Sequence, residues 1–153
     1  MSTAKLTFGT PTAFTITLAS LATSTAGVGR QATMIDNSTN GYLGAQINGY
    51  VKLGTSPTGN KSVGIYLLRS DGTRRTDNAG ASDAGITLYN AECLGRFYDK
   101  ASPSTGDVVY VDCHIPFLGK EWTIAVVHDT AVNLDSTEGN HSLYWTGYRG
   151  DIA

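Results

Sequence analysis

Residues 12–18 read Thr12-Ala-Phe14-Thr-Ile16-Thr-Leu18. Apolar side chains occupy every second position from Phe14 onward, and threonines fill the positions between them. This period of two is the signature of a β-strand that buries one face and exposes the other. The stretch therefore predicts a half-buried strand, and the same period recurs further along the chain.

Two later stretches are apolar on both faces. Residues 122–128, Trp122-Thr-Ile-Ala-Val-Val-His128, are rich in β-branched side chains and predict a central strand. Residues 62–69 predict a second interior strand for the same reason. Shorter or half-buried strands are expected at residues 31–35, 42–53, 86–88, 92–98, 107–114 and 141–148.

These stretches, about eight in number, are separated by turn residues, and no segment has a convincing helical period. The pattern predicts an all-β fold: a single-domain antiparallel β-sandwich, jelly-roll-like, with a small barrel as the alternative. The domain is expected to span residues 1–153, with residues 1–11 as an N-terminal arm. Gly44 and Gly49, inside one expected strand, are expected to mark bulges or a bend.

The composition excludes several classes of protein. Only 16% of the 153 residues are charged, the net charge is -2, and Ser, Thr and Gly make up about a third of the chain. A coiled coil or helical bundle would be richer in Ala, Glu, Lys and Leu. Without a basic excess to neutralise phosphates, nucleic acid is not an expected partner.

The expected location follows from what the chain lacks. Residues 1–8 hold no apolar run of signal-peptide length, and no stretch has the 18 apolar residues of a membrane span. We therefore expect synthesis in a cytoplasm and no membrane partner. In that reducing compartment Cys93 and Cys113 are expected to be small buried side chains, with a disulfide formed after release as the alternative.

Sequence motifs for catalysis and metal binding are weak. Cys113 and His114 are adjacent in an expected strand, so their side chains should point to opposite faces and not share an ion with Cys93. No Gly-x-Ser-x-Gly motif is present, and the three histidines are expected at the surface or at strand edges. We expect no enzymatic activity, no metal and no cofactor.

Acidic residues cluster near the C-terminus, at Asp129, Asp135 and Glu138. Their spacing lacks the pattern of an EF-hand calcium loop, and nothing fixes the separation that paired glycosidase carboxylates need. We therefore expect these three acidic side chains to be solvated in loops.

Four residues are candidates for contact with a partner. Arg74 and Arg75 lie in the longest polar stretch, residues 71–85, and are expected to be balanced by the neighbouring Asp71 and Asp77. Tyr144 and Tyr148 fall on the opposite strand face from Trp145, which is expected in the core together with Trp122. The two tyrosines could stack on a sugar.

Several segments together resemble small virion structural proteins of tailed bacteriophages. They are residues 18–22, 28–33, 36–40, 51–57, 62–67, 122–130 and 140–147, and they cover strands and turns across most of the chain. At residues 70–85 the chain differs, because Arg74-Arg75 stands where those proteins have a more acidic, glycine-rich hairpin.

The resemblance implies a β-sandwich that coats or joins part of a phage particle. Within that group we expect a capsid decoration (cement) protein on the outer surface of the virion head, made in the host cytoplasm. Its expected partners are the lattice of the major capsid protein and further copies of itself, as a dimer or trimer. A tail- or fibre-associated module that binds a surface glycan or receptor is the alternative.

Overall fold

The structure, a computed structural model, describes residues 4–152. Residues 1–3 of the expected N-terminal arm and residue 153 lie outside the described residues. The strands are β1 (Ala4–Phe8), β2 (Thr12–Ala13), β3 (Val28–Gln31), β4 (Ile35–Asp36), β5 (Gly44–Lys52), β6 (Ser62–Ser70), β7 (Ala84–Thr87), β8 (Glu92–Tyr98), β9 (Val108–Ile115), β10 (Glu121–His128) and β11 (Ser142–Ile152). Two short 3-10 turns, η1 (Thr76–Asn78) and η2 (Glu138–Asn140), interrupt the loops.

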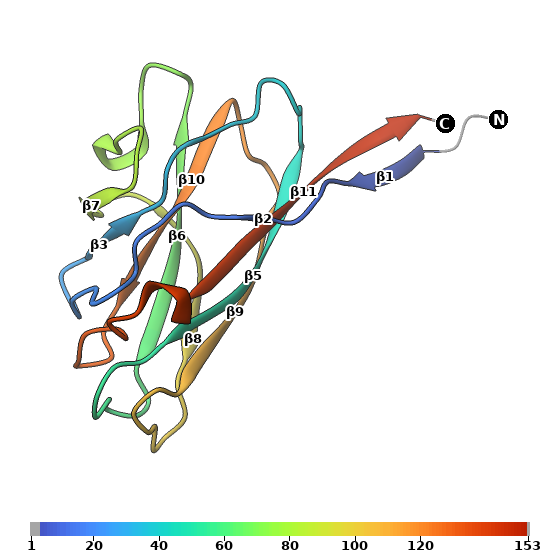
Figure 1. Ribbon diagram of the computed structural model, residues 1–153. Coiled ribbons are helices and arrows are strands. Elements are labelled where there is room, and N and C mark those ends of the chain that lie inside the picture. The colour runs from blue at the N-terminus through green and yellow to red at the C-terminus, as the bar shows by residue number, and fades with distance from the viewer. Residues whose placement is uncertain (1–3, 153) are drawn as a thin grey trace.

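The strands form two antiparallel sheets that face each other (Figure 1). One sheet has the order β1-β11-β5-β9, and β2 also pairs with β11. The other has the order β7-β3-β10-β6-β8, and β4 also pairs with β10. The predicted all-β sandwich is confirmed, and residues 92–98 form a strand with the predicted bounds.

The eleven strands of residues 4–152 can be grouped into the eight principal strands of a jelly roll. The short strands β1 and β2 both pair with β11, and β3 and β4 both pair with β10, so each couple acts as one interrupted strand. With β7 taken as an insertion, the principal strands in chain order give sheets of order 1-8-3-6 and 2-7-4-5. This interleaving of two Greek keys is the jelly-roll topology.

The core lies between the sheets and is built by the predicted alternation. Trp122 is fully buried, and its ring meets Trp145 and Phe14 edge to face, with centroids 5.3 and 5.9 Å apart. Edge-to-face pairs of this kind add roughly 0.5–1.5 kcal/mol each to what area burial provides. The predicted core positions of both tryptophans are confirmed.

A second apolar cluster covers the outer face of the six-stranded sheet. Leu68 of β6, Ala125 of β10 and Ile86 of β7 are buried there together with Ala79, which belongs to the segment between β6 and β7. The side chain of Gln31 anchors this segment, since its amide accepts from the N–H of Gly80 at 2.9 Å and donates to two carbonyls. This cover explains why residues 62–69 are apolar on both faces.

The prediction of one strand over residues 12–18 is wrong in extent. Only Thr12–Ala13 pair with β11, although Phe14 and Leu18 remain buried and keep the period of two. Beyond Phe14 the chain leaves that sheet and crosses to the other, where the carbonyl of Thr15 accepts from the N–H of Thr33. The alternation of apolar and polar residues therefore predicted correctly which side chains are buried, but not that the backbone pairs with another strand.

The expected bulges at Gly44 and Gly49 are not found. The pairing of β5 with β9 and β11 runs through both glycines without a register shift. The irregularity lies instead in the pairing of β6 with β8, between Ile65 and Tyr66. Gly49 has φ of 151°, and a Cβ there would overlap the carbonyl oxygen of Ser142. Close approach of the neighbouring strand explains this glycine.

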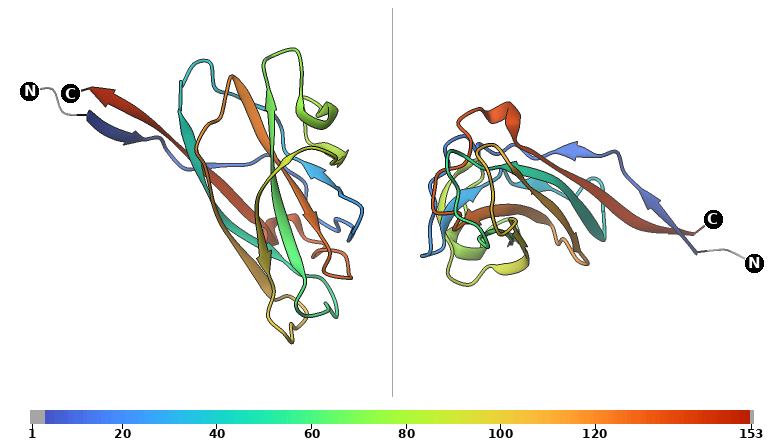
Figure 2. Two further views of the ribbon diagram at one scale, coloured as in Figure 1. Left: turned by 180° about the vertical axis from the view of Figure 1, so that it is seen from behind. Right: turned by 90° about the horizontal axis from the view of Figure 1, so that it is seen from below.

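The two chain ends project together beyond the sandwich (Figures 1 and 2). Strand β11 pairs with β5 as far as Tyr148, whereas its pairing with β1 continues to Ile152. The predicted last strand, residues 141–148, is therefore four residues too short. We call the two-stranded projection formed by residues 4–8 and 148–152 the terminal ribbon.

Candidate interaction surface

The outer face of the five-stranded sheet carries several aromatic side chains. Tyr144 of β11 is 44% exposed and Tyr110 of β9 is 72% exposed. Tyr50 of β5 lies opposite Tyr110 in the ladder, and their ring centroids are 6.3 Å apart. Tyrosine is enriched in protein interfaces, because its ring supplies apolar area and its hydroxyl a hydrogen bond.

The terminal ribbon continues this face and is amphipathic. Leu6 and Phe8 point to the same side as Tyr148, which is the ladder partner of Phe8, and are 57% and 60% exposed. The opposite side of the ribbon is polar: Lys5 is the ladder partner of Asp151. A strand pair with one apolar and one charged face normally buries the apolar one.

A groove of about 540 Å³ lies where the ribbon joins the sheet. Its lining residues are Leu6, Phe8, Gln46, Asp112, Cys113, His114 and Tyr148. The volume is in the range of roughly 300–1,000 Å³ that is typical of occupied protein pockets.

Hydrogen bonds and stacking hold the wall of the groove in place. Tyr148 stacks on the His114 ring with centroids 5.5 Å apart, and its hydroxyl lies 2.7 Å from Nε2 of His114. The carboxylate of Asp112 accepts from the side-chain amide of Asn48 at 3.0 Å. Asp112 is the only charged residue among those that line the groove.

The two predicted tyrosines therefore differ. Both lie on the outer face of β11, opposite Trp145, as predicted, and Tyr144 is exposed. Tyr148 is half-buried between Phe8 and His114, so its ring is less available to a partner. Tyr110 was not among the predicted residues, although the period of two in residues 107–114 is a signal that could have found it. Leu6 and Phe8 were missed because no strand was predicted in residues 1–11.

The predicted arginines lie on the other side of the molecule, in the segment that covers the six-stranded sheet. Arg74 is exposed, whereas Nη2 of Arg75 lies 4.0 Å from the Glu121 carboxylate at the start of β10. The structure does not bring either arginine near Tyr144 or Tyr148.

The expected balance of these arginines by neighbouring aspartates is found for Asp71 and not for Asp77. Backbone hydrogen bonds from Arg74 and Thr73, together with the charge of Arg74, lower the pKa of Asp71. The Asp71 carboxylate accepts the backbone N–H groups of Thr73 and Arg74, at 2.8 and 2.7 Å. The Asp77 carboxylate accepts the backbone N–H groups of residues 89–91. Short carboxylates in loops often bind nearby amides in this way, which competes with side-chain ion pairs.

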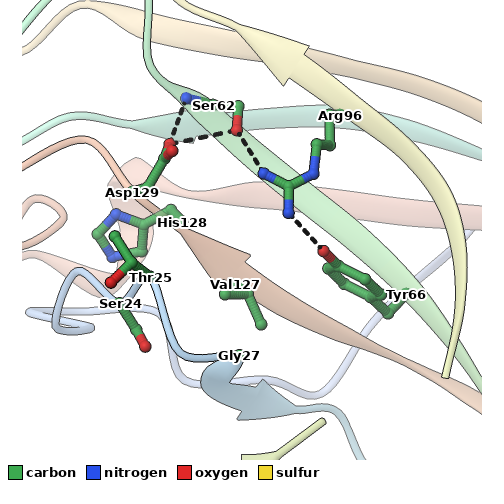
Figure 3. Close-up of a pocket in the computed structure, with 9 residues that line it drawn as sticks. All are labelled: Ser24, Thr25, Gly27, Ser62, Tyr66, Arg96, Val127, His128 and Asp129. Carbon is green, nitrogen blue, oxygen red and sulfur yellow. Dashed lines mark hydrogen bonds between the residues drawn. The ribbon is translucent and has the colours of Figure 1, made fainter. Parts of the chain in front are cut away.

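A small polar pocket lies beside the six-stranded sheet (Figure 3). The guanidinium of Arg96 donates to the hydroxyls of Ser62 and Tyr66, at 3.3 and 3.0 Å. The same Ser62 hydroxyl donates to Asp129, which also accepts the Ser62 N–H at 2.6 Å. The volume of about 120 Å³ is well below that of most ligand sites, and the polar groups satisfy one another. This network joins β8, β6 and the end of β10.

The loop acids are structural acceptors and are not simply solvated as expected. Glu138 accepts the backbone N–H groups of Leu18 and Ala19, at 2.8 and 2.7 Å. Hydrogen bonds from Asn140 and from the Thr137 N–H, with the charge of Lys52, lower the pKa of Asp135 to about 2. Among residues 4–152, no three His, Cys, Asp or Glu side chains are grouped to hold a metal ion.

His128 is fully buried, so the prediction of a surface or edge position is wrong for this histidine. Its Nε2 lies 2.9 Å from the carbonyl of Leu21, and its Nδ1 lies 2.9 Å from the Thr130 hydroxyl. A carbonyl only accepts, so Nε2 carries the hydrogen and Nδ1 of the neutral ring can only accept. The single hydroxyl hydrogen of Thr130 can serve either this Nδ1 or the Val132 carbonyl, whose oxygen lies 3.1 Å away. Burial lowers the pKa of His128 from its ordinary value of 6.5.

The cysteines are both free thiols. Cys113 is buried as predicted, and it points to the opposite face from the exposed His114. Burial raises the pKa of the Cys113 thiol to about 11, so it stays protonated. Cys93 is exposed on β8, and the prediction that it is buried is wrong.

Comparison with known proteins gives no relative: no protein-family model, no curated protein and no solved structure matches this chain. In the part of the chain that the structure describes, no helix is long and apolar enough to cross a bilayer.

Proposed function

We propose that this chain is a non-enzymatic structural protein of a bacteriophage virion. In its most specific form, the proposal is a capsid decoration (cement) protein that binds the outside of the head shell as a homo-oligomer. Binding only the assembled shell would stabilise that state by mass action. The sequence resemblance supplies the viral setting, and the surface described above supplies the physical support.

The terminal ribbon is the observation that carries the proposal. A two-stranded ribbon has little stability by itself in water, so a projecting one gains most when another surface covers it. Leu6 and Phe8 place apolar area on the ribbon, beyond the edge of the sandwich. A projecting apolar segment of this kind allows a subunit of an assembly to contact its neighbours.

The jelly-roll fold is compatible with a role in a virus particle, but it does not identify the molecule that this protein binds. Jelly rolls form viral capsid domains and also lectins, and fold alone does not assign function. The low charge of the chain suits polar and aromatic contacts between symmetric copies. Many copies on a repeating lattice also gain avidity, so each contact can be weak.

Arg74 is the residue that we assign to a second contact, with an acidic group on the shell. It is exposed and lies far along the chain from both strands of the ribbon. An exposed charge of this kind changes association rates and salt dependence more than it changes affinity. Arg75 contributes less, because Glu121 already faces it.

Sedimentation with heads assembled without this protein tests the proposal. We expect saturable co-sedimentation of the purified chain, and a higher temperature for heat-induced release of DNA from the decorated heads. Arg74→Glu should weaken binding at low salt, with Arg74→Lys as the matched control that keeps the charge. Failure of the unmodified chain to bind heads would refute the decoration role.

The exposed tyrosines favour a second candidate, a glycan- or receptor-binding module of a tail or fibre. Tyr50, Tyr110 and Tyr144 form a surface on which sugar rings could stack. This candidate predicts binding on a glycan array that Tyr144→Ala or Tyr110→Ala abolishes while the fold stays intact. Binding to heads without any glycan signal would reject it.

A further inference from the structure

We propose that the terminal ribbon and the groove at its base form a self-association surface, on which two copies of this chain pack face to face about a twofold axis. The ribbon of each copy then lies over the groove of the other. This inference rests on the proposed function for its biological setting, and it names the contact that makes the homo-oligomer.

The first argument is that the ribbon is built for burial on one side. Leu6 and Phe8 share the face of Tyr148, whereas Lys5 and Asp151 share the opposite face. Exposing two large apolar side chains on a projecting strand costs free energy, and burial would recover about 25 cal/mol per Å² of apolar area. The polarity of the far side leaves only one face of the ribbon suited to a partner.

The second argument is self-complementarity. Leu6 and Phe8 belong both to the ribbon and to the lining of the groove, so one patch supplies the inserted side chains and also receives them. A twofold axis requires this, because residue i of one copy contacts residue j of the other and the reverse. Asp112 is the only charge in the lining, so pairing the patch with itself brings few like charges together.

The third argument is the open backbone edge. In its sheet β1 is the last strand, so its outer edge has no partner strand among residues 4–152. Beyond Tyr148, β11 likewise pairs with β1 alone. Open edges of this length template further pairing unless another surface covers them. A second copy packed face to face on the ribbon would exclude further chains from these edges.

The fourth argument is area. Three strands, β11, β5 and β9, about 4.8 Å apart and about eight residues long, at about 3.4 Å per residue, present roughly 390 Å² of flat surface. The ribbon adds roughly 160 Å² by the same dimensions. Together they approach the roughly 600 Å² per partner at the lower end of specific, stable interfaces. The exposed tyrosines of the sheet face would fall inside the contact.

Analytical ultracentrifugation of the full chain tests the inference. We expect the unmodified chain to sediment as a dimer at micromolar concentration, and the double variant Leu6→Ser/Phe8→Ser to dissociate at least about 10-fold more readily. The matched control, Lys5→Ser/Thr7→Ser, changes the same strand on its polar face and should remain a dimer. Circular dichroism of each variant verifies the fold.

Hydrogen exchange of the same samples locates the contact. Amides of residues 5–8 and 149–151 should gain protection as the concentration of the unmodified chain rises, and not in the double variant. A monomer at all concentrations, or a dimer that the double variant leaves intact, would overturn the inference. So would protection of these amides only when heads are added, since the occupant would then be the shell.

The two proposals can fail separately. A chain that dimerises through the ribbon without binding heads keeps this inference and loses the decoration role. A chain that binds heads as a monomer keeps the head-binding role and loses this inference.

Discussion

His128 shows how the sandwich retains a polar side chain in its interior. Both ring nitrogens lie within hydrogen-bond distance of a polar group, at Leu21 and Thr130, which allows the neutral imidazole to be buried. Protonation would add a charge to a site from which water is excluded, which is why burial lowers its pKa. The stability of the whole domain is therefore coupled to pH through this one residue.

The coupling has a definite sign. The unfolded chain binds a proton at His128 near pH 6.5, whereas the folded chain binds it only at lower pH. The contribution of the neutral ring is therefore complete above pH 6.5 and is lost as the pH falls from that value through the lower pKa of the folded chain. We expect the midpoint of thermal unfolding to decrease from pH 8 to pH 5.

The variant His128→Gln should remove much of this pH dependence, while its lost packing lowers the midpoint at pH 8. Thermal unfolding at four pH values between 5 and 8 measures both. A flat profile for the unmodified chain, or an unaltered slope in His128→Gln, would contradict the assignment.

At this scale the sequence predicted burial better than polar contacts. The period of two placed Trp145 and Tyr144 correctly, because side-chain direction in a strand depends only on parity. The apolar run of residues 122–128 placed Trp122 correctly in the core. It could not show that Asp77 binds the backbone of residues 89–91, or that Arg75 faces Glu121. Such contacts depend on how loops fold back, which no local pattern encodes.

At the scale of the elements, β5 is the strand on which the outer face depends, because it lies between β11 and β9. Gly49 in the middle of β5 permits this close pairing. Its φ of 151° lies outside the range that L-residues adopt readily, and a Cβ would meet the backbone of Ser142.

We expect Gly49→Ala to destabilise the fold by about 2 kcal/mol or more, since it combines backbone strain with overlap against a fixed carbonyl. Gly85→Ala is the matched control, because a Cβ at Gly85 meets nothing within 4 Å in the structure. Chemical denaturation of both variants compares them. Equal midpoints would show that close approach at Gly49 is not a constraint.

The strands were predicted from their period, and most were found close to the expected bounds. The terminal ribbon was not predicted, for a physical reason. Leu6 and Phe8 alternate with polar residues, but a stretch of five residues is too short to distinguish an edge strand from an arm. Residues 149–152 hold few apolar side chains, so nothing local extended the last strand beyond residue 148.

At the scale of the whole molecule, the two sheets are asymmetric in how they meet solvent. The segment after β6 covers the outer face of the six-stranded sheet with its own apolar cluster. The outer face of the five-stranded sheet keeps its aromatic side chains exposed, and the terminal ribbon extends it (Figure 2). This difference directs the expected contacts of the protein to one side.

The central claim is that the ribbon pairs copies of this protein, and that the paired copies bind a particle more tightly through avidity. Co-sedimentation with heads assembled without the protein tests it most directly, with the unmodified chain, Leu6→Ser/Phe8→Ser and Lys5→Ser/Thr7→Ser compared at one concentration series. We predict saturable binding of the unmodified chain and the polar-face control, and binding at least about 10-fold weaker for the apolar-face variant. Equal binding of all three chains, or no binding by any, would contradict the claim.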